Sequence, residues 1–210
     1  MSMLSKVWRA MLANPFRLLP VSFAVMIGLG TLLLLLPQAT VAGRKTTVLD
    51  ALFTATSAVC VTGLSVVDTA THWTGFGQGM ILLLIQIGGL GIVTVVSIGI
   101  VLLADRIGLS HTRILAADLR VDSYSDVPKL VRNIVLTTVA FEAVFALVLA
   151  ARFFFAHDYE FQTAVVHGVF HSISAWNNAG FALYTDNFMG FANDWFFSIA
   201  VCLAVILGGI

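Results

Sequence analysis

Long apolar stretches alternate with short polar segments along this chain. Leu18 to Leu36 is apolar, residues 133–155 form another apolar stretch, and a last one begins near residue 193. Between Asp68 and Asp105 there is no Asp, Glu, Lys or Arg. About 20 apolar residues let a helix cross a bilayer, so each stretch predicts a membrane-spanning helix. A helix over residues 74–104 would exceed the hydrocarbon core and would tilt or extend past it.

The composition agrees with this pattern. The 210 residues are 59% hydrophobic and only 10% charged, whereas about a quarter of the residues in a soluble domain are charged. We therefore expect an all-α integral membrane protein. The formal net charge of zero does not suggest a nucleic-acid partner. Cys60 and Cys202 do not have the spacing of a metal-binding motif, and they imply no disulfide framework.

The segment from Thr47 to Asp68 is too rich in hydroxyl groups and too short to cross a bilayer. Thr47 and Asp50 match a capping box, which opens a helix, and Cys60-Val61-Thr62-Gly63 breaks it. A helix that ends in irregular backbone at membrane depth must line protein or water. Its C-terminal end carries partial negative charge, and rings of backbone carbonyls coordinate cations in ion filters. The segment therefore predicts a re-entrant helix followed by a cation filter.

This segment has a counterpart later in the chain. Ser57, Ala58 and Gly63 recur at the same spacing as Ser174, Ala175 and Gly180, with Phe53 and Phe170 ahead of them, and Gly88-Gly89 recurs as Gly208-Gly209. Each unit reads as a spanning helix, a re-entrant helix, a loop broken by glycine and a second spanning helix. Two spanning helices return the chain to the same side, so the two units are parallel repeats. They are not the inverted repeats that are typical of many secondary transporters.

Basic residues set the expected orientation. Most of the 11 Lys and Arg residues lie in an N-terminal arm, residues 1–17, and in a polar connection, residues 105–132. Positively charged loops stay in the cytoplasm, so we place both segments there. Ile114, Leu115 and Leu119 predict a short amphipathic helix in the connection. The expected organisation is an arm (1–17), a first repeat (18–104), the connection (105–132) and a second repeat (133–210), with Trp73 as an interface anchor.

Three motifs resemble the TrkH/KtrB family of potassium-translocating subunits, which is related to the plant HKT transporters. They are Phe53-Thr-Ala-Thr-Ser-Ala-Val-Cys-Val-Thr-Gly-Leu64, Gln86-Ile-Gly-Gly-Leu-Gly91 and Trp176-Asn-Asn-Ala-Gly-Phe181. Proteins of that family place four M1–P–M2 repeats around one pore. The resemblance implies that this chain is KtrB-like, holds about two of those repeats and conducts potassium.

The resemblance also implies the site and the partners. The filter residues would be Cys60, Val61, Thr62 and Gly63 near 60–64, and Asn177, Asn178, Ala179 and Gly180 near 177–181. Glycine at position 63 favours K⁺, and Na⁺ stays open. We expect K⁺ as the transported ion, no cofactor within the chain, a multi-pass protein of the cell inner membrane, a homodimer, and a cytosolic nucleotide-binding ring of the KtrA/TrkA type.

The family pattern also suggests that the sequence is part of a longer protein. The second repeat stops at Ile210 without a polar flank, and the family's third and fourth repeats do not follow. The alternative is a non-conducting assembly subunit that binds full-length partners.

Several side chains allow two interpretations. Glu142 lies in the middle of a spanning helix, where it serves either the ion path or, as we favour, as a bundle-facing carboxylate bonded to the neighbouring re-entrant helix. Arg152 is expected to extend to the outer interface. Asn177 and Asn178 either coordinate the ion or, as we favour, brace the loop. The thiol of Cys60 is expected to be a packing residue and not a redox centre. His167 and His171 share a helix face, so a metalloenzyme that uses them with Glu160 is the competing hypothesis.

Overall fold

The computed structural model describes residues 15–91 and 127–210, and these residues form helices without any strand. The amphipathic helix expected near Ile114 and the first part of the polar connection lie outside the described residues. The elements in chain order are α2 (Pro15–Leu34), α3 (Val48–Val59), α4 (Thr69–His72), α5 (Gly75–Gly89), α8 (Val127–Ala156), α9 (Phe161–Trp176), the short 3₁₀ helix η1 (Met189–Phe191) and α10 (Trp195–Gly208).

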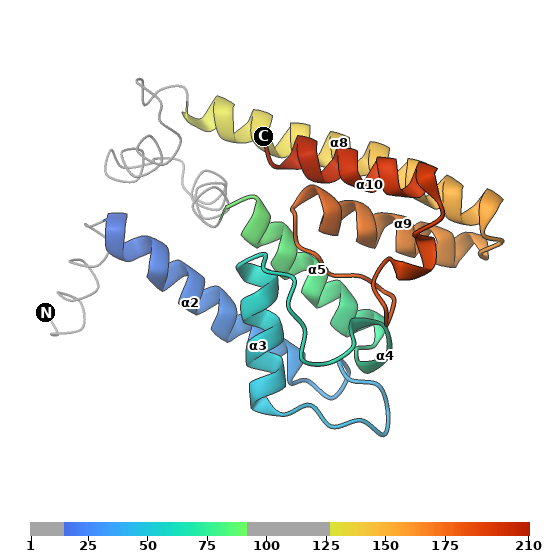
Figure 1. The fold of residues 1–210 in the computed structure, drawn as a ribbon. Coiled ribbons are helices and arrows are strands. Elements are labelled where there is room, and N and C mark those ends of the chain that lie inside the picture. Colours follow the sequence, from blue (N-terminus) through green and yellow to red (C-terminus); the bar gives the residue numbers. More distant parts are fainter. Residues whose placement is uncertain (1–14, 92–126) are drawn as a thin grey trace, which may run out of the picture.

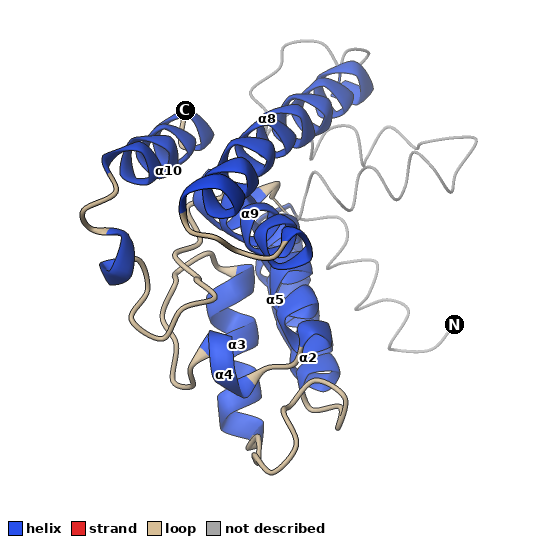
Figure 2. Cartoon of the chain, turned by 90° about the vertical axis from the view of Figure 1, so that its right-hand side faces the viewer, coloured by secondary structure: helices blue, strands red, loops and turns tan. Residues whose placement is uncertain are grey.

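The helices form two groups that follow the chain order (Figure 1). In the first group, α2 and α5 both pack against α3. In the second group, α8 packs along α9 and α10 contacts both. Figure 2 shows the same division from the side. The order of a long helix, a shorter helix, a loop and another helix therefore occurs twice, as the sequence repeat predicts.

Helix α2 ends earlier than the sequence suggests. The apolar stretch continues to Leu36, but the helix ends at Leu34. The Leu36 N–H bonds to the carbonyl of Leu33 at 3.3 Å, which tightens the last turn. Pro37 follows, and a proline disfavours helical backbone at the residue before it. The C-terminal boundary is therefore set by the proline and not by the apolar pattern.

Helix α3 begins at the capping box that the sequence predicts. The Asp50 N–H donates to the Thr47 hydroxyl at 3.1 Å, and the Thr47 N–H donates to the Asp50 carboxylate at 2.9 Å. Two backbone donors that have no partner within the helix are thereby satisfied. The helix ends at Val59, directly before the predicted break.

Helix α5 is shorter than the continuous helix expected over residues 74–104, and this prediction is wrong at Gly91. The helix ends at Gly89, and Gly91 has a positive φ of 80°. The Gly91 N–H bonds to the carbonyl of Gly88 at 3.1 Å, as at a helix end closed by glycine. Trp73, the expected interface anchor, is instead 1% exposed and belongs to the core of the first group.

Within the described ranges, one helix is long and apolar enough to cross a membrane, the part of α8 from Val131 to Ala156. The apolar helices α3, α5, α10 and the part of α2 from Pro20 to Leu34 are shorter. Helix α8 includes residues 127–132, which the sequence analysis assigned to the connection. Large apolar side chains on the outer faces are exposed, for example Leu147 on α8 and Ile199 on α10.

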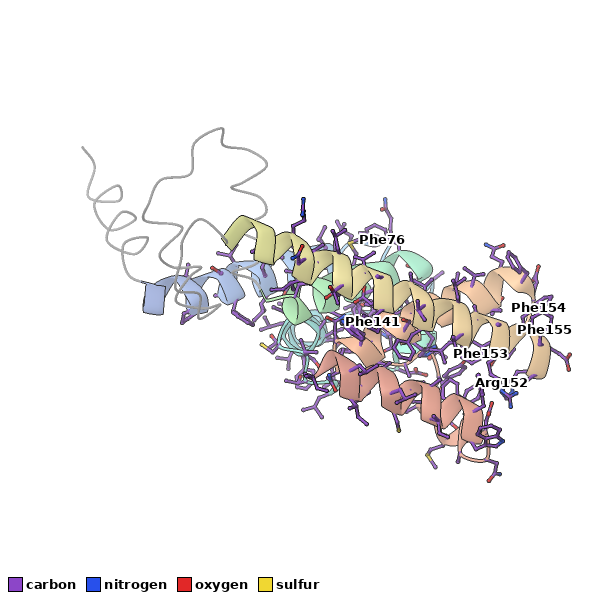
Figure 3. All side chains as sticks on the ribbon, turned by 90° about the horizontal axis from the view of Figure 1, so that it is seen from above. Phe76, Phe141, Arg152, Phe153, Phe154 and Phe155 are labelled. Carbon is purple, nitrogen blue, oxygen red and sulfur yellow. The ribbon has the colours of Figure 1, made fainter. Side chains whose placement is uncertain are left out.

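Arg152, which the sequence analysis expects to extend to the outer interface, forms an ion pair within the protein. Near the end of α8, beside the start of α10 (Figure 3), its guanidinium forms two hydrogen bonds of 2.9 Å to the carboxylate of Asp194. His157 contacts the same carboxylate at 2.8 Å. Asp194 also caps α10 by accepting the Phe197 N–H. A paired charge costs less to bury than a free one. The ion pair joins the end of α8 to the start of α10.

The two groups share one core. Phe170 of α9, with Ala179, Phe181 and Leu183 of the following loop, packs among buried residues of α3 and α5. The Thr185 hydroxyl donates to the Asp68 carboxylate at 2.7 Å, which joins the loops that follow α3 and α9. The second loop is therefore held by the first group as well as by its own helices.

Candidate functional site

The site begins where α3 and α9 end, because both helices close in the same way. The Thr62 N–H reaches back to the carbonyl of Ser57 at 2.9 Å, and the Ala179 N–H reaches back to that of Ser174 at 2.7 Å. The residues in between, Val61 (φ 54°) and Asn178 (φ 57°), have left-handed backbone. This is the Schellman motif, and it turns the chain sharply away from the helix axis.

The left-handed backbone of this motif is strained at Val61. Asparagine tolerates left-handed backbone, whereas a β-branched residue is strained there. Strain of this kind persists only where the surroundings impose it, and it concentrates at functional sites. Val61 is half-buried against the core of the first group. The loop geometry is therefore imposed by packing and not by local preference.

Gly63 and Gly180 follow two residues later, and their backbones touch. Their φ angles are 74° and 73°. A Cβ on Gly63 would lie 2.6 Å from the Ala179 carbonyl oxygen and 3.1 Å from the Gly180 Cα. Both residues need glycine for the positive φ, and Gly63 needs it for the close approach as well. The structure thus brings the glycines of the two predicted filter segments together.

Helices α5 and α10 support the ends of α3 and α9 in matching ways. A Cβ on Gly88 of α5 would collide with the carbonyl oxygen of Val59, the last residue of α3. A Cβ on Gly208 of α10 would likewise collide with that of Trp176, the last residue of α9. Small residues allow helices this close. The glycine pairs found in the sequence therefore mark the same contact in both groups.

The two asparagines of the second loop use their side chains to brace it. Asn177 Nδ2 donates to the Ile173 carbonyl at 2.9 Å and to Glu142 Oε1 at 3.0 Å. Asn178 Nδ2 donates to the Val205 carbonyl of α10 at 3.2 Å. These contacts agree with the favoured interpretation that the asparagines hold the loop. Val61 and Ala179 have apolar side chains, so only their backbone oxygens can coordinate a cation.

Cys60, which the sequence analysis takes as a packing residue and not a redox centre, is an exposed residue. It occupies the place in the first loop that Asn177 occupies in the second, directly after the helix. The first loop instead closes on itself, since the Thr62 hydroxyl donates to the Ser57 hydroxyl at 3.0 Å.

A polar pocket of about 170 Å³ lies beside the glycine pair. Its lining includes Gly63, Gly180, Asp68, Thr185 and Asp186. Burial raises the pKa of Asp68, but hydrogen bonds from Thr185, Thr71 and the Ala70 N–H outweigh this, so the pKa is lowered. An ionised carboxylate beside the pocket attracts cations. The sequence analysis did not predict that Asp68 and Thr185 meet; their matching places in the two repeats were the available signal.

Glu142 is 7% exposed and faces the helix bundle. Its carboxylate accepts the hydrogen bond from Asn177, and its backbone carbonyl accepts one from Ser172 of α9 at 2.6 Å. The contacts are those of the bundle-facing interpretation.

His167 and His171 share a face of α9 as predicted, but hydrogen bonds occupy them. His171 is fully buried: its Nε2 accepts the Leu183 N–H at 3.0 Å and its Nδ1 donates to the His167 carbonyl at 2.8 Å. His167 Nδ1 pairs with the Tyr184 hydroxyl at 2.9 Å. Among the described residues no three His, Cys, Asp or Glu side chains come together as metal ligands do. The geometry gives no support to the metalloenzyme hypothesis.

Comparison with known proteins identifies the family of this chain. The family model described as TrkH, cation transport protein, matches residues 6–210. This chain belongs to the TrkH family of cation transport proteins. The membership agrees with the apolar helices of a membrane protein, and the family is described as one of cation transport proteins.

The chain is also similar to curated members of the TrkH family. It is 38% identical over 197 residues to the Ktr system potassium uptake protein B of Bacillus subtilis, covering 94% of this chain and 43% of the relative. The protein of the same name from Vibrio alginolyticus is 38% identical over 194 residues, 92% of this chain and 42% of the relative. The potassium/sodium uptake protein NtpJ of Enterococcus hirae is 34% identical over 94% of this chain and 43% of the relative. The chain thus spans less than half the length of these relatives.

Proposed function

We propose that this chain forms part of the pore of a potassium uptake protein and supplies two of its filter segments. In this proposal α3 and α9 are re-entrant helices that end inside the membrane, and each group of helices is one parallel M1–P–M2 repeat. The filter segments are 60–63 and 177–180. The proposal rests on one observation above all: two helices with the same Schellman end bring Gly63 and Gly180 into contact.

Physical chemistry supports this assignment. The C-terminal end of a helix carries partial negative charge, so two such ends that converge favour a cation between the loops. Backbone carbonyls can replace the hydration shell of K⁺. The carboxylates of Asp68 and Asp186 border the adjacent pocket, and we place that pocket on the outer side, where it would gather cations before they enter.

The wider assembly is part of the same proposal. Two relatives are named as the B protein of a Ktr system. We propose that the complete protein forms a homodimer on a cytosolic nucleotide-binding ring of the KtrA/TrkA type, with the N-terminal arm and residues 105–132 in the cytoplasm. Selection of Na⁺ in addition to K⁺ is the competing outcome, since one relative is named as a potassium/sodium uptake protein.

Growth on limiting potassium tests the proposal. The natural full-length protein, with and without a ring partner, is expressed in bacteria that lack potassium uptake, beside the 210-residue chain alone. We expect the full-length protein to restore growth and the 210-residue chain to fail. No rescue by full-length protein that is present in the membrane would contradict the transport function, and rescue by the short chain would contradict its role as part of a larger pore.

A further inference from the structure

Glu142 is the buried acidic side chain at the centre of the one long apolar helix in the described ranges. A carboxylate in such a helix is costly unless other groups compensate it. Here the compensation comes from the second filter loop, because Asn177 Nδ2 lies 3.0 Å from Glu142 Oε1. Gln86 of α5 lies next to the same amide, with its Oε1 3.5 Å from Asn177 Nδ2.

Asn177 is the point at which the second loop leaves α9. It is the C-cap of that helix and precedes the left-handed residue Asn178. Its side-chain nitrogen donates both to Glu142 and back to the Ile173 carbonyl. A displacement of this amide would therefore move the start of the loop that ends at Gly180.

The other side of the same amide is closed by α5. A Cβ on Gly89 would collide with the side-chain oxygen of Asn177. One amide thus lies between a helix of the first group and a helix of the second. At the matching place the first loop has Cys60, whose thiol is exposed, so this brace belongs to the second loop only.

The backbone of α8 is also held in place at Glu142. Ser172 of α9 donates to the carbonyl oxygen of Glu142 itself. The glutamate is thereby attached to α9 through its backbone and to the loop through its side chain. Two such bonds restrict the position of the Glu142 carboxylate more than either bond alone.

We propose that Glu142 is a positioning residue for the second filter loop and that its acceptor oxygen, through Asn177, sets the discrimination between K⁺ and Na⁺. This inference rests on the proposed function of the loop as a filter. The role belongs to the hydrogen-bond acceptor and not to the charge. Loss of this acceptor should change selectivity, because a filter distinguishes ions by the placement of a few carbonyls.

The test measures rubidium uptake by the full-length protein and its inhibition by Na⁺. Glu142→Gln keeps an acceptor oxygen and should leave Na⁺ inhibition unchanged. Glu142→Met keeps the length of the side chain but removes the acceptor, and should strengthen Na⁺ inhibition roughly fivefold, the scale of one hydrogen bond. Glu160→Leu removes an exposed carboxylate that makes no capping bond, and serves as the matched control.

A double variant separates positioning from general damage. If both residues act through one bond, Glu142→Met with Asn177→Ala should be no worse than the more severe of the two single variants. Additive effects, wild-type selectivity in Glu142→Met, or lost selectivity in Glu142→Gln would each overturn the proposal. If the wild-type protein takes up no rubidium, the proposed function fails instead. Protein amount in the membrane is measured for every variant, and if Glu142→Met is absent, Asn177→Ala alone must show the change.

Discussion

Gly88 and Val59 are in backbone contact: helix α5 lies against the last carbonyl of α3 so closely that a single methyl group on Gly88 would overlap that oxygen. The same relationship joins Gly208 and Trp176 in the second group. The end of each shorter helix is therefore fixed by a helix that follows it in the chain, and the loop geometry depends on these contacts.

Gly88→Ala should destabilise the full-length protein by about 1–3 kcal/mol, because the added methyl group meets backbone that cannot rotate away. Gly79→Ala is the matched control on the same helix. Nothing lies within 4 Å of a Cβ at Gly79, so alanine should be neutral or stabilise by about 0.5–1 kcal/mol. Thermal unfolding in detergent measures both variants. Equal effects would mean that the contact between Gly88 and Val59 does not limit packing.

The Arg152–Asp194 pair should make stability depend on pH. Hydrogen bonds from Arg152 first, then from His157 and the Phe197 N–H, hold the pKa of Asp194 well below its usual range despite its burial. A carboxyl group with a lowered pKa in the folded protein stabilises it fully above its unfolded pKa, near 4, and loses this contribution as the pH falls further. The melting temperature should therefore decrease from about pH 4 downward.

Asp194→Asn should remove much of that decrease, because asparagine can still cap α10 but does not titrate. The control is Asp158→Asn, at an exposed position with φ of 54°, where asparagine is well tolerated. Melting curves between pH 3 and pH 7 compare the two variants. An unchanged pH profile in Asp194→Asn would show that another group causes the acid sensitivity.

His171→Leu should destabilise the protein by about 1–3 kcal/mol, since the buried Leu183 N–H loses its acceptor. Zinc should not accompany the wild-type protein in stoichiometric amount, because hydrogen bonds occupy both ring nitrogens of His171. Elemental analysis of purified protein and thermal unfolding test these statements. One zinc ion per wild-type chain that is lost in His171→Leu would support the metalloenzyme hypothesis instead.

Much of this arrangement could be predicted from local patterns. The capping box at Thr47 and Asp50, the break after Val59 and the recurrence of Gly63 as Gly180 each depend on neighbouring residues. The structure confirms the capping box and the helix end and gives both glycines a positive φ. Membership of the TrkH family, which the motifs indicated, is confirmed as well.

The rest depended on contacts between distant residues. The sequence shows Arg152 near a helix end, but only the fold shows that Asp194 lies beside it. Trp73 has the polar neighbours of an interface residue, yet tertiary packing buries it. The length of α5 was overestimated because apolar composition does not reveal that Gly91 takes left-handed backbone.

The central claim is that Gly63 and Gly180 form part of an ion filter, and K⁺ over Na⁺ selectivity of uptake in glycine variants tests it most directly. Gly43→Ala is the control: its φ of 86° carries the same backbone strain, but nothing lies within 4 Å of its Cβ. We predict that Gly63→Ala abolishes uptake or selectivity and that Gly43→Ala preserves both. Gly180→Ala should weaken uptake or selectivity less than Gly63→Ala, because the nearest atom to its added Cβ is 3.2 Å away. Wild-type selectivity in Gly63→Ala, with the protein present in the membrane, would contradict the filter assignment.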